Sequence, residues 1–70
     1  MNNSEENTIG KRVRKMRKRK GLNQQELADI LGKSLRTVQK YENGEINISV
    51  GMVNTIAKVL ETSSSYLLGY

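Results

Sequence analysis

The chain has 70 residues, enough for one small domain built around a single core. It contains no Cys, His, Phe, Trp or Pro, so we expect an aliphatic core, no disulfide and none of the usual zinc or imidazole chemistry. The net charge of +5 and the pI near 9.8 favour a polyanionic partner. The composition therefore predicts a small basic domain that is not an enzyme and that binds no metal or cofactor.

The N-terminus is polar and, with Glu5 and Glu6, differs from a signal peptide. We interpret residues 1–7 as a flexible polar tail and residues 8–70 as the folded domain. No apolar run approaches the roughly 20 residues that cross a bilayer. The sequence accordingly predicts a cytoplasmic protein without a membrane partner.

The first predicted helix covers residues 8–20, where apolar side chains recur at helical spacing. These apolar residues form one stripe: Ile9, Val13 and Met16. Cations fill the other faces, and residues 11–20 contain no carboxylate. A charged helix face is usually only solvated, so we expect one or two of these cations, Arg12 or Lys20, to lie near phosphate and the rest to add salt-dependent attraction.

Two short helices follow, joined by a very short connection. Asn23 begins a capping-box pattern ahead of a helix over residues 24–31. Ser34 is a candidate N-cap for a helix over residues 35–43. The connection, residues 32–34, is too tight for antiparallel packing but suits the sharp turn of a helix-turn-helix.

The C-terminal part carries two further N-cap signals. Ser49 precedes an apolar pattern that ends near Leu60, and Ser63 precedes a final helical turn. We expect the isoleucines of the loop over residues 44–48 to tuck beneath it. The final turn supplies candidate core residues, of which a part could form a dimer contact with Val59 and Tyr70: Tyr66, Leu67 and Leu68. The chain is therefore predicted to be all-α, with five short helices.

The segment from Gly21 to Gly44, GLNQQELADILGKSLRTVQKYENG, resembles the Xre/Cro-type (lambda-repressor-like) helix-turn-helix DNA-binding domains of phage repressors and bacterial regulators. The resemblance extends from Ile9 to Gly69 and includes the basic first helix and the closing SYLLG. It implies a compact five-helix domain with the helix-turn-helix at its second and third helices. It also implies a sequence-specific regulator of transcription that binds double-stranded DNA, most simply a repressor that binds a palindromic operator as a homodimer.

The third predicted helix carries the candidate base-reading residues. Val38 and Tyr41 face inward, and the side chains outside them share one face that can enter the major groove. These candidates are Leu35, Arg36, Gln39 and Lys40. Arg36 has the donors to bind guanine, and Gln39 can pair with adenine. The alternative is that the four residues form a solvated helix face.

The resemblance further implies contacts to the DNA backbone and one internal ion pair. Gln24, at the start of the second helix, matches a glutamine that binds phosphate, although a plain helix-start role is the alternative. Further candidates for phosphate are Ser34, Thr37 and Asn43. For Ser34, a purely structural cap is an equal alternative. An ion pair between Arg17 and Glu42 is expected to tie the first helix to the recognition helix.

Two positions depart from the common pattern of the family. Ile48 stands where a proline is frequent, and Glu61 stands where a glycine follows the fourth helix. Without glycine, the turn after that helix is expected to be strained or differently shaped. Because this turn borders the expected dimer contact, the dimer geometry does not follow from the resemblance.

Two other functions compete with DNA binding by a regulator. Antitoxins use the same fold and also cover a protein toxin, so a toxin is a possible protein partner, as is a missing C-terminal domain. Membrane-surface binding through the cationic first helix is disfavoured, because its apolar stripe is narrow and lacks Trp and Phe.

Overall fold

The computed structural model describes residues 8–70 and contains helices joined by short loops, with no strand in that range. The predicted tail, residues 1–7, lies outside the described residues. The helices are α1 (Ile9–Arg19), α2 (Gln24–Leu31), α3 (Leu35–Asn43), α4 (Val50–Val59) and α5 (Ser64–Leu68). The predicted all-α class with five helices is confirmed.

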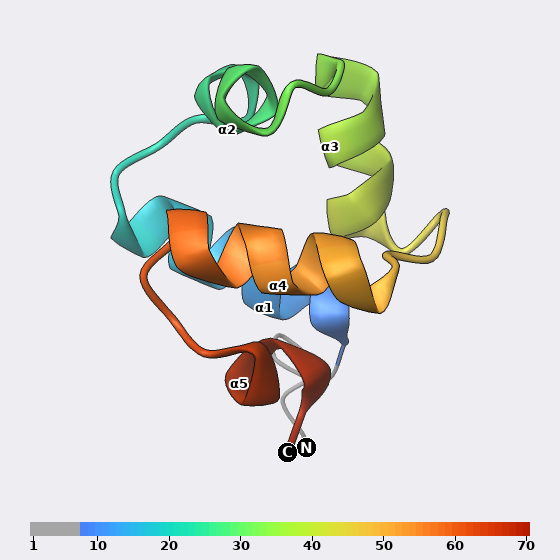
Figure 1. The fold of residues 1–70 in the computed structure, drawn as a ribbon. Coiled ribbons are helices and arrows are strands. Elements are labelled where there is room, and N and C mark those ends of the chain that lie inside the picture. Colours follow the sequence, from blue (N-terminus) through green and yellow to red (C-terminus); the bar gives the residue numbers. More distant parts are fainter. Residues whose placement is uncertain (1–7) are drawn as a thin grey trace, which may run out of the picture.

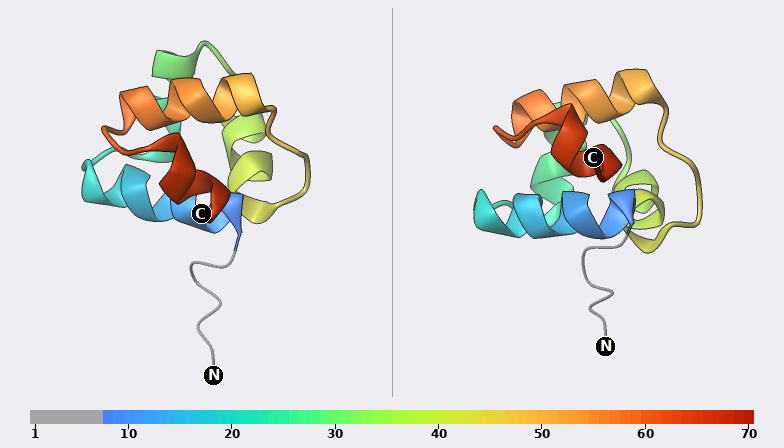
Figure 2. Two further views of the ribbon diagram at one scale, coloured as in Figure 1. Left: turned by 60° about the horizontal axis from the view of Figure 1, so that its bottom comes forward. Right: turned by 90° about the horizontal axis from the view of Figure 1, so that it is seen from below.

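The helices form a closed arrangement in which α2 and α3 lie together at one end of the molecule (Figure 1). α1 and α4 lie on opposite sides of the remaining part, and α5 packs between them and contacts both (Figure 2). α3 also packs against α1, and α2 against α4. The helix-turn-helix pair thus rests on α1 and α4, and α5 joins these two helices to each other.

Each helix begins at a residue whose side chain accepts a hydrogen bond from the backbone N–H three residues later. These N-cap residues are Thr8, Asn23, Ser34, Ser49 and Ser63. At α2 the cap is reciprocal, because Glu26 accepts a bond from the backbone N–H of Asn23 at 2.8 Å. Such caps satisfy N–H groups that have no partner within the helix, which fixes where each helix starts.

The helix ends are also alike. Beyond each helix, a backbone N–H reaches back to a carbonyl in the last turn, as Thr62 does to Ala57 at 2.9 Å. This is the hydrogen bond of a Schellman motif, which requires a left-handed residue just before the donor. Glycine fills that position after the other four helices, and Glu61 fills it after α4 with φ 58°. The predicted strain in this turn is therefore located at Glu61.

Glu61→Gly is expected to raise the melting temperature by a few degrees, because a side chain disfavours left-handed backbone and glycine does not. The gain is limited, since glycine also increases the entropy of the unfolded chain and the exposed ion pair with Lys20, 2.7 Å, is lost. Glu61→Ala is the control, because it removes the ion pair and keeps the backbone penalty. Thermal unfolding should move in opposite directions for the two variants, and a shift in the same direction would contradict the strain.

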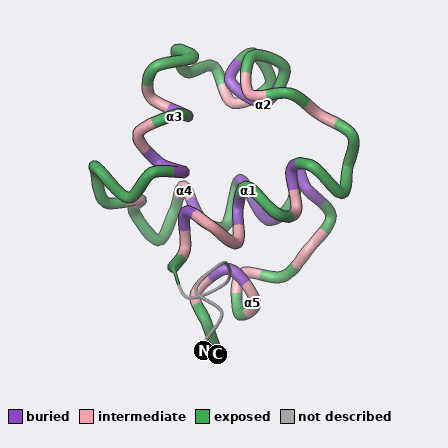
Figure 3. The backbone as a smooth tube through the Cα atoms, turned by 180° about the vertical axis from the view of Figure 1, so that it is seen from behind, coloured by how far each residue is buried: buried purple, intermediate pink, exposed green. Residues whose placement is uncertain are grey.

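The core is aliphatic apart from Tyr41 and is shared by all the helices (Figure 3). Its largest fully buried side chains are Val13, Leu27, Val38, Val53, Ile56 and Leu67. The core role predicted for Tyr41 is confirmed, since 8% of the residue is exposed, and Tyr66 and Leu68 pack against the core as predicted. The expectation for the loop over residues 44–48 is half wrong: Ile48 packs on the core, whereas Ile46 is 40% exposed.

α1 approaches α3 so closely that only glycine fits at one position. A Cβ added to Gly10 would lie 2.3 Å from the carbonyl oxygen of Tyr41 and 2.8 Å from that of Glu42. The N-terminal part of α1 therefore rests directly on the last turn of α3.

Among residues 8–70, no helix combines the length and the apolarity that a membrane span requires.

Candidate nucleic-acid interface

α3 separates an inner face from an outer polar face. Its inner side chains are Val38, Tyr41 and Glu42, all of them buried. None of the four predicted base-reading residues is among these buried side chains: Leu35, Arg36, Gln39 and Lys40. Arg36 and Gln39 are exposed, Leu35 is 36% exposed at the first position of the helix, and Lys40 is half-buried. All four side chains therefore keep some surface that a partner can reach.

A shallow polar hollow follows the same side of α3. It is lined by Arg36, Gln39, Lys40, Asn43 and Glu45. The first four are spaced along one helix face, and Glu45 comes from the loop that follows. Asn43 is tied weakly into this group, since its amide nitrogen lies 3.4 Å from a carboxylate oxygen of Glu45.

The beginning of α3 is held by two hydroxyl groups. Ser34 Oγ accepts the backbone N–H of Thr37 at 3.1 Å and lies 3.0 Å from Thr37 Oγ1. Ser34 is exposed and Thr37 is half-buried, so the capping role predicted for Ser34 is confirmed. The phosphate role of both residues stays a prediction, and a cap does not exclude it because a hydroxyl can donate and accept at once.

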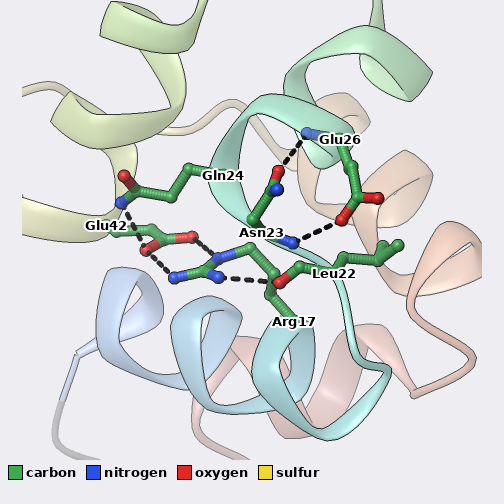
Figure 4. A network of polar contacts seen from close by, with 6 residues as sticks. All are labelled: Arg17, Leu22, Asn23, Gln24, Glu26 and Glu42. Carbon is green, nitrogen blue, oxygen red and sulfur yellow. Dashed lines mark hydrogen bonds and ion pairs between the residues drawn. The ribbon is translucent and has the colours of Figure 1, made fainter.

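A buried polar network joins α1, α2 and α3 (Figure 4). Arg17 donates through Nε to Glu42 Oε2 at 2.7 Å and through Nη2 to Oε1 at 3.0 Å. Their side chains are 7% and 1% exposed, so the ion pair expected between them is present and almost fully buried. Arg17 Nη1 also donates to the carbonyl of Leu22 at 2.8 Å, in the loop that leads into α2. Two charged residues therefore hold α1, α2 and α3 in position relative to one another.

Gln24 belongs to this network, which the sequence did not indicate. Its Nε2 donates to Glu42 Oε1 at 3.0 Å, so the first side chain of α2 is tied to the last turn of α3 (Figure 4). The two residues are 18 positions apart, and no local pattern links them. The backbone N–H of Gln24 lies in the first turn of α2, ahead of any acceptor within the helix. Gln24 thus stands at the electropositive end of α2 with a fixed side chain.

Two cations of the basic segment, Arg12 in α1 and Lys20 just after it, have partners in the C-terminal part of the chain. Arg12 donates through Nε to the carbonyl of Leu67 at 2.9 Å, at the end of α5. Lys20 pairs with Glu61 after α4, and the bond and charge of Lys20 lower the pKa of Glu61. The two cations predicted to lie near phosphate are therefore engaged with the C-terminal part of the chain. Their proximity to phosphate stays a prediction.

The comparisons with known proteins agree with this geometry. A helix-turn-helix family model matches residues 13–67. An uncharacterized HTH-type transcriptional regulator of Rickettsia conorii is 38% identical over 58 residues, which cover 83% of this chain and 46% of the relative. Antitoxin PezA of Streptococcus pneumoniae is 33% identical over 61 residues, covering 87% of this chain and 39% of the antitoxin. This chain thus spans about half the length, or less, of these curated relatives.

Among solved structures, the fold is similar to that of the P22 c2 repressor in complex with a synthetic operator. The TM-score is 0.80 and the identity 27%, over 89% of this chain and 94% of the repressor chain. The five-helix architecture, the polar outer face of α3 and the family match over most of the chain agree with one another. The chain therefore belongs to the Xre/Cro-type, lambda-repressor-like family of helix-turn-helix DNA-binding domains.

Proposed function

We propose that this chain binds double-stranded DNA sequence-specifically through α2 and α3 and regulates transcription in the cytoplasm. The observation that carries the proposal is the set of outward side chains on α3, next to the start of α2, in a chain similar to a repressor bound to its operator. Repression by occupying a promoter needs no surface beyond this one. The net charge of +5 adds attraction to any duplex.

Base recognition is assigned to the outer face of α3. Arg36 can donate two hydrogen bonds to guanine O6 and N7, and Gln39 can form a paired contact with adenine. Leu35, at the first position of α3, can touch a thymine methyl group. Lys40 can reach guanine or phosphate. These contacts would use the N-terminal part of a helix that lies in the major groove.

Positioning on the DNA backbone is assigned to polar groups around that face. Gln24 lies at the start of α2, where backbone N–H groups and the helix dipole favour an anion. Ser34, Thr37 and Asn43 lie at the two ends of α3. Contacts of this kind set the register of a protein on the duplex and carry no sequence information themselves.

We further propose that the chain acts as a homodimer on a palindromic operator. A single module reads one half-site, and two modules related by a two-fold axis read half-sites about one helical turn apart. The C-terminal part suits such a contact, because Tyr70 is 94% exposed and Val59 and Leu68 are only half-buried. The dimer would thereby double the number of base contacts.

The similarity to antitoxin PezA supports a second candidate, a regulator that also binds a protein toxin. The matched 61 residues make up 39% of that antitoxin. The matched part in this chain is mainly the helix-turn-helix domain, so the similarity supports DNA binding first. Copurification of a partner with the protein expressed from its own operon separates the two candidates.

Selection of binding sites from a random duplex pool tests the proposed function, followed by titration of the selected site against scrambled DNA at physiological salt. We expect an inverted repeat that binds many-fold more tightly than the scrambled duplex. Binding without preference that disappears as salt rises would overturn sequence-specific regulation, since it would come from net charge alone.

Arg36→Ala is expected to weaken the selected site by about 1–3 kcal/mol and to relax the preference at one base pair. Gln24→Ala is expected to weaken the selected and scrambled duplexes about equally, because phosphate contacts are independent of sequence. Arg14→Ala is the matched control, since it removes the same charge from an exposed position on α1. An unchanged base preference in Arg36→Ala at matched salt would contradict the base-reading assignment.

A further inference from the structure

The network around Glu42 reaches the side chain to which we assign a phosphate contact. Glu42 is 4% exposed and lies in the last turn of α3, yet its Oε1 accepts hydrogen bonds from both Arg17 and Gln24. Gln24 is half-buried at the first position of α2. The buried carboxylate therefore contacts a residue at the proposed DNA surface directly.

This contact fixes which way the Gln24 amide faces. A carboxylate paired with a guanidinium can only accept hydrogen bonds, so the amide nitrogen of Gln24 must face Glu42 and the amide oxygen must face away (Figure 4). One N–H of Gln24 is used by Glu42, and the second stays available for a phosphate oxygen. A glutamine without such an anchor would rotate freely until DNA binds. The side-chain entropy that it then loses opposes binding.

Arg17 makes this arrangement compatible with a phosphate. A carboxylate alone beside the phosphate contact would repel it, and Arg17 compensates that charge through two hydrogen bonds. The third hydrogen bond of Arg17, to the carbonyl of Leu22, fixes the backbone that leads into the N-cap of α2. The guanidinium thus acts on both the side chain and the backbone of the proposed phosphate site.

We propose that Glu42, paired with Arg17, is a positioning residue for DNA binding that orients the Gln24 amide toward phosphate before DNA arrives. This inference rests on the proposed function, because it assigns Gln24 to the DNA backbone. It goes beyond the structural role of an ion pair that joins α1 to α3. Its consequence is that removing the pair weakens DNA binding through Gln24 even when the domain stays folded.

A double-mutant cycle tests this coupling at constant net charge. The double variant Arg17→Met/Glu42→Leu removes the acceptor of Gln24 together with both charges, and apolar replacement of a buried pair usually preserves folding. We expect this variant to bind the selected and the scrambled duplex about 2- to 10-fold more weakly. This factor corresponds to the entropy cost of immobilising one side chain on binding. When Gln24→Ala is added to this variant, the affinity for duplex DNA should equal that of Gln24→Ala alone.

Each deviation from this pattern has a distinct meaning. Wild-type affinity in the double variant, or a loss that adds fully to that of Gln24→Ala, overturns the positioning role. Arg36→Ala is the control in the same background and should add its full loss, because Arg36 has no contact with the network. If Gln24→Ala binds as the wild type does, the phosphate assignment of Gln24 fails and the positioning role fails with it. Absence of duplex binding by the wild type overturns the proposed function itself.

A second measurement needs no substitution and no DNA. Nitrogen relaxation of the side-chain amide groups in the wild-type protein should give Gln24 a markedly higher order parameter than the exposed Gln39. Equal mobility of the two amides overturns the positioning role, whatever the fate of the variants. This result is independent of whether the chain binds DNA.

Discussion

Arg17→Met is expected to lower the free energy of unfolding by about 3–5 kcal/mol, the usual effect of leaving one member of a buried ion pair without its partner. In this variant Glu42 keeps a side chain that is 1% exposed and loses two of its three hydrogen bonds. The total free energy of unfolding of a protein is about 0.05–0.15 kcal/mol per residue, so the loss is a large fraction of the stability of a domain this small. Chemical denaturation followed by circular dichroism measures it.

The double variant Arg17→Met/Glu42→Leu should recover most of that loss, because an apolar pair fills the same space without a buried charge. Lys20→Met is the comparison for an exposed pair and should change stability much less, since solvent already screens the Lys20–Glu61 contact. If Arg17→Met were as mild as Lys20→Met, the network would contribute little to holding the three helices together.

Gly10→Ala is expected to lower the free energy of unfolding by about 1–3 kcal/mol, the range for forcing an extra methyl group into a packed site. The new Cβ would lie 2.3 Å from a backbone carbonyl oxygen of α3, and backbone cannot move aside as a flexible side chain can. α1 would have to shift away from α3. The expected loss opposes the ordinary stabilisation that alanine gives in a helix.

Gly51→Ala is the matched control, because it makes the same change in a helix where the added Cβ meets no atom within 4 Å outside its own stretch of backbone. It should raise the free energy of unfolding by about 0.4–1 kcal/mol. Urea denaturation of the two variants should therefore give shifts of opposite sign. Stabilisation by Gly10→Ala would mean that α1 and α3 are not held at the separation described.

The boundaries of the helices were predictable because their signals are local. Ser34 and Ser63 lie three residues from the N–H groups that they accept, so the cap can be identified without knowledge of the fold. The departure at Glu61 was also visible, since the position needs left-handed backbone whichever residue fills it. The outward face of α3 followed from helical spacing once Val38 and Tyr41 were placed inside.

Features that depend on the packing of distant segments were not predictable from these patterns. Gly10 gave no sign of its role, because only the position of α1 on α3 makes glycine necessary there. The bond between Gln24 and Glu42 depends on the angle between α2 and α3. Arg12 was expected near phosphate because it is a cation, and its contact with the end of α5 appears only when the chain is folded.

The N-caps and the Schellman hydrogen bonds at the helix ends affect how fast the protein folds. Each boundary is set by hydrogen bonds between residues close together in the sequence, so a helix can acquire its limits before its tertiary partners arrive. Little loop entropy then has to be lost before the core forms. Helical domains with such local contacts refold in microseconds to milliseconds, so newly unfolded molecules would expose their apolar surface only briefly.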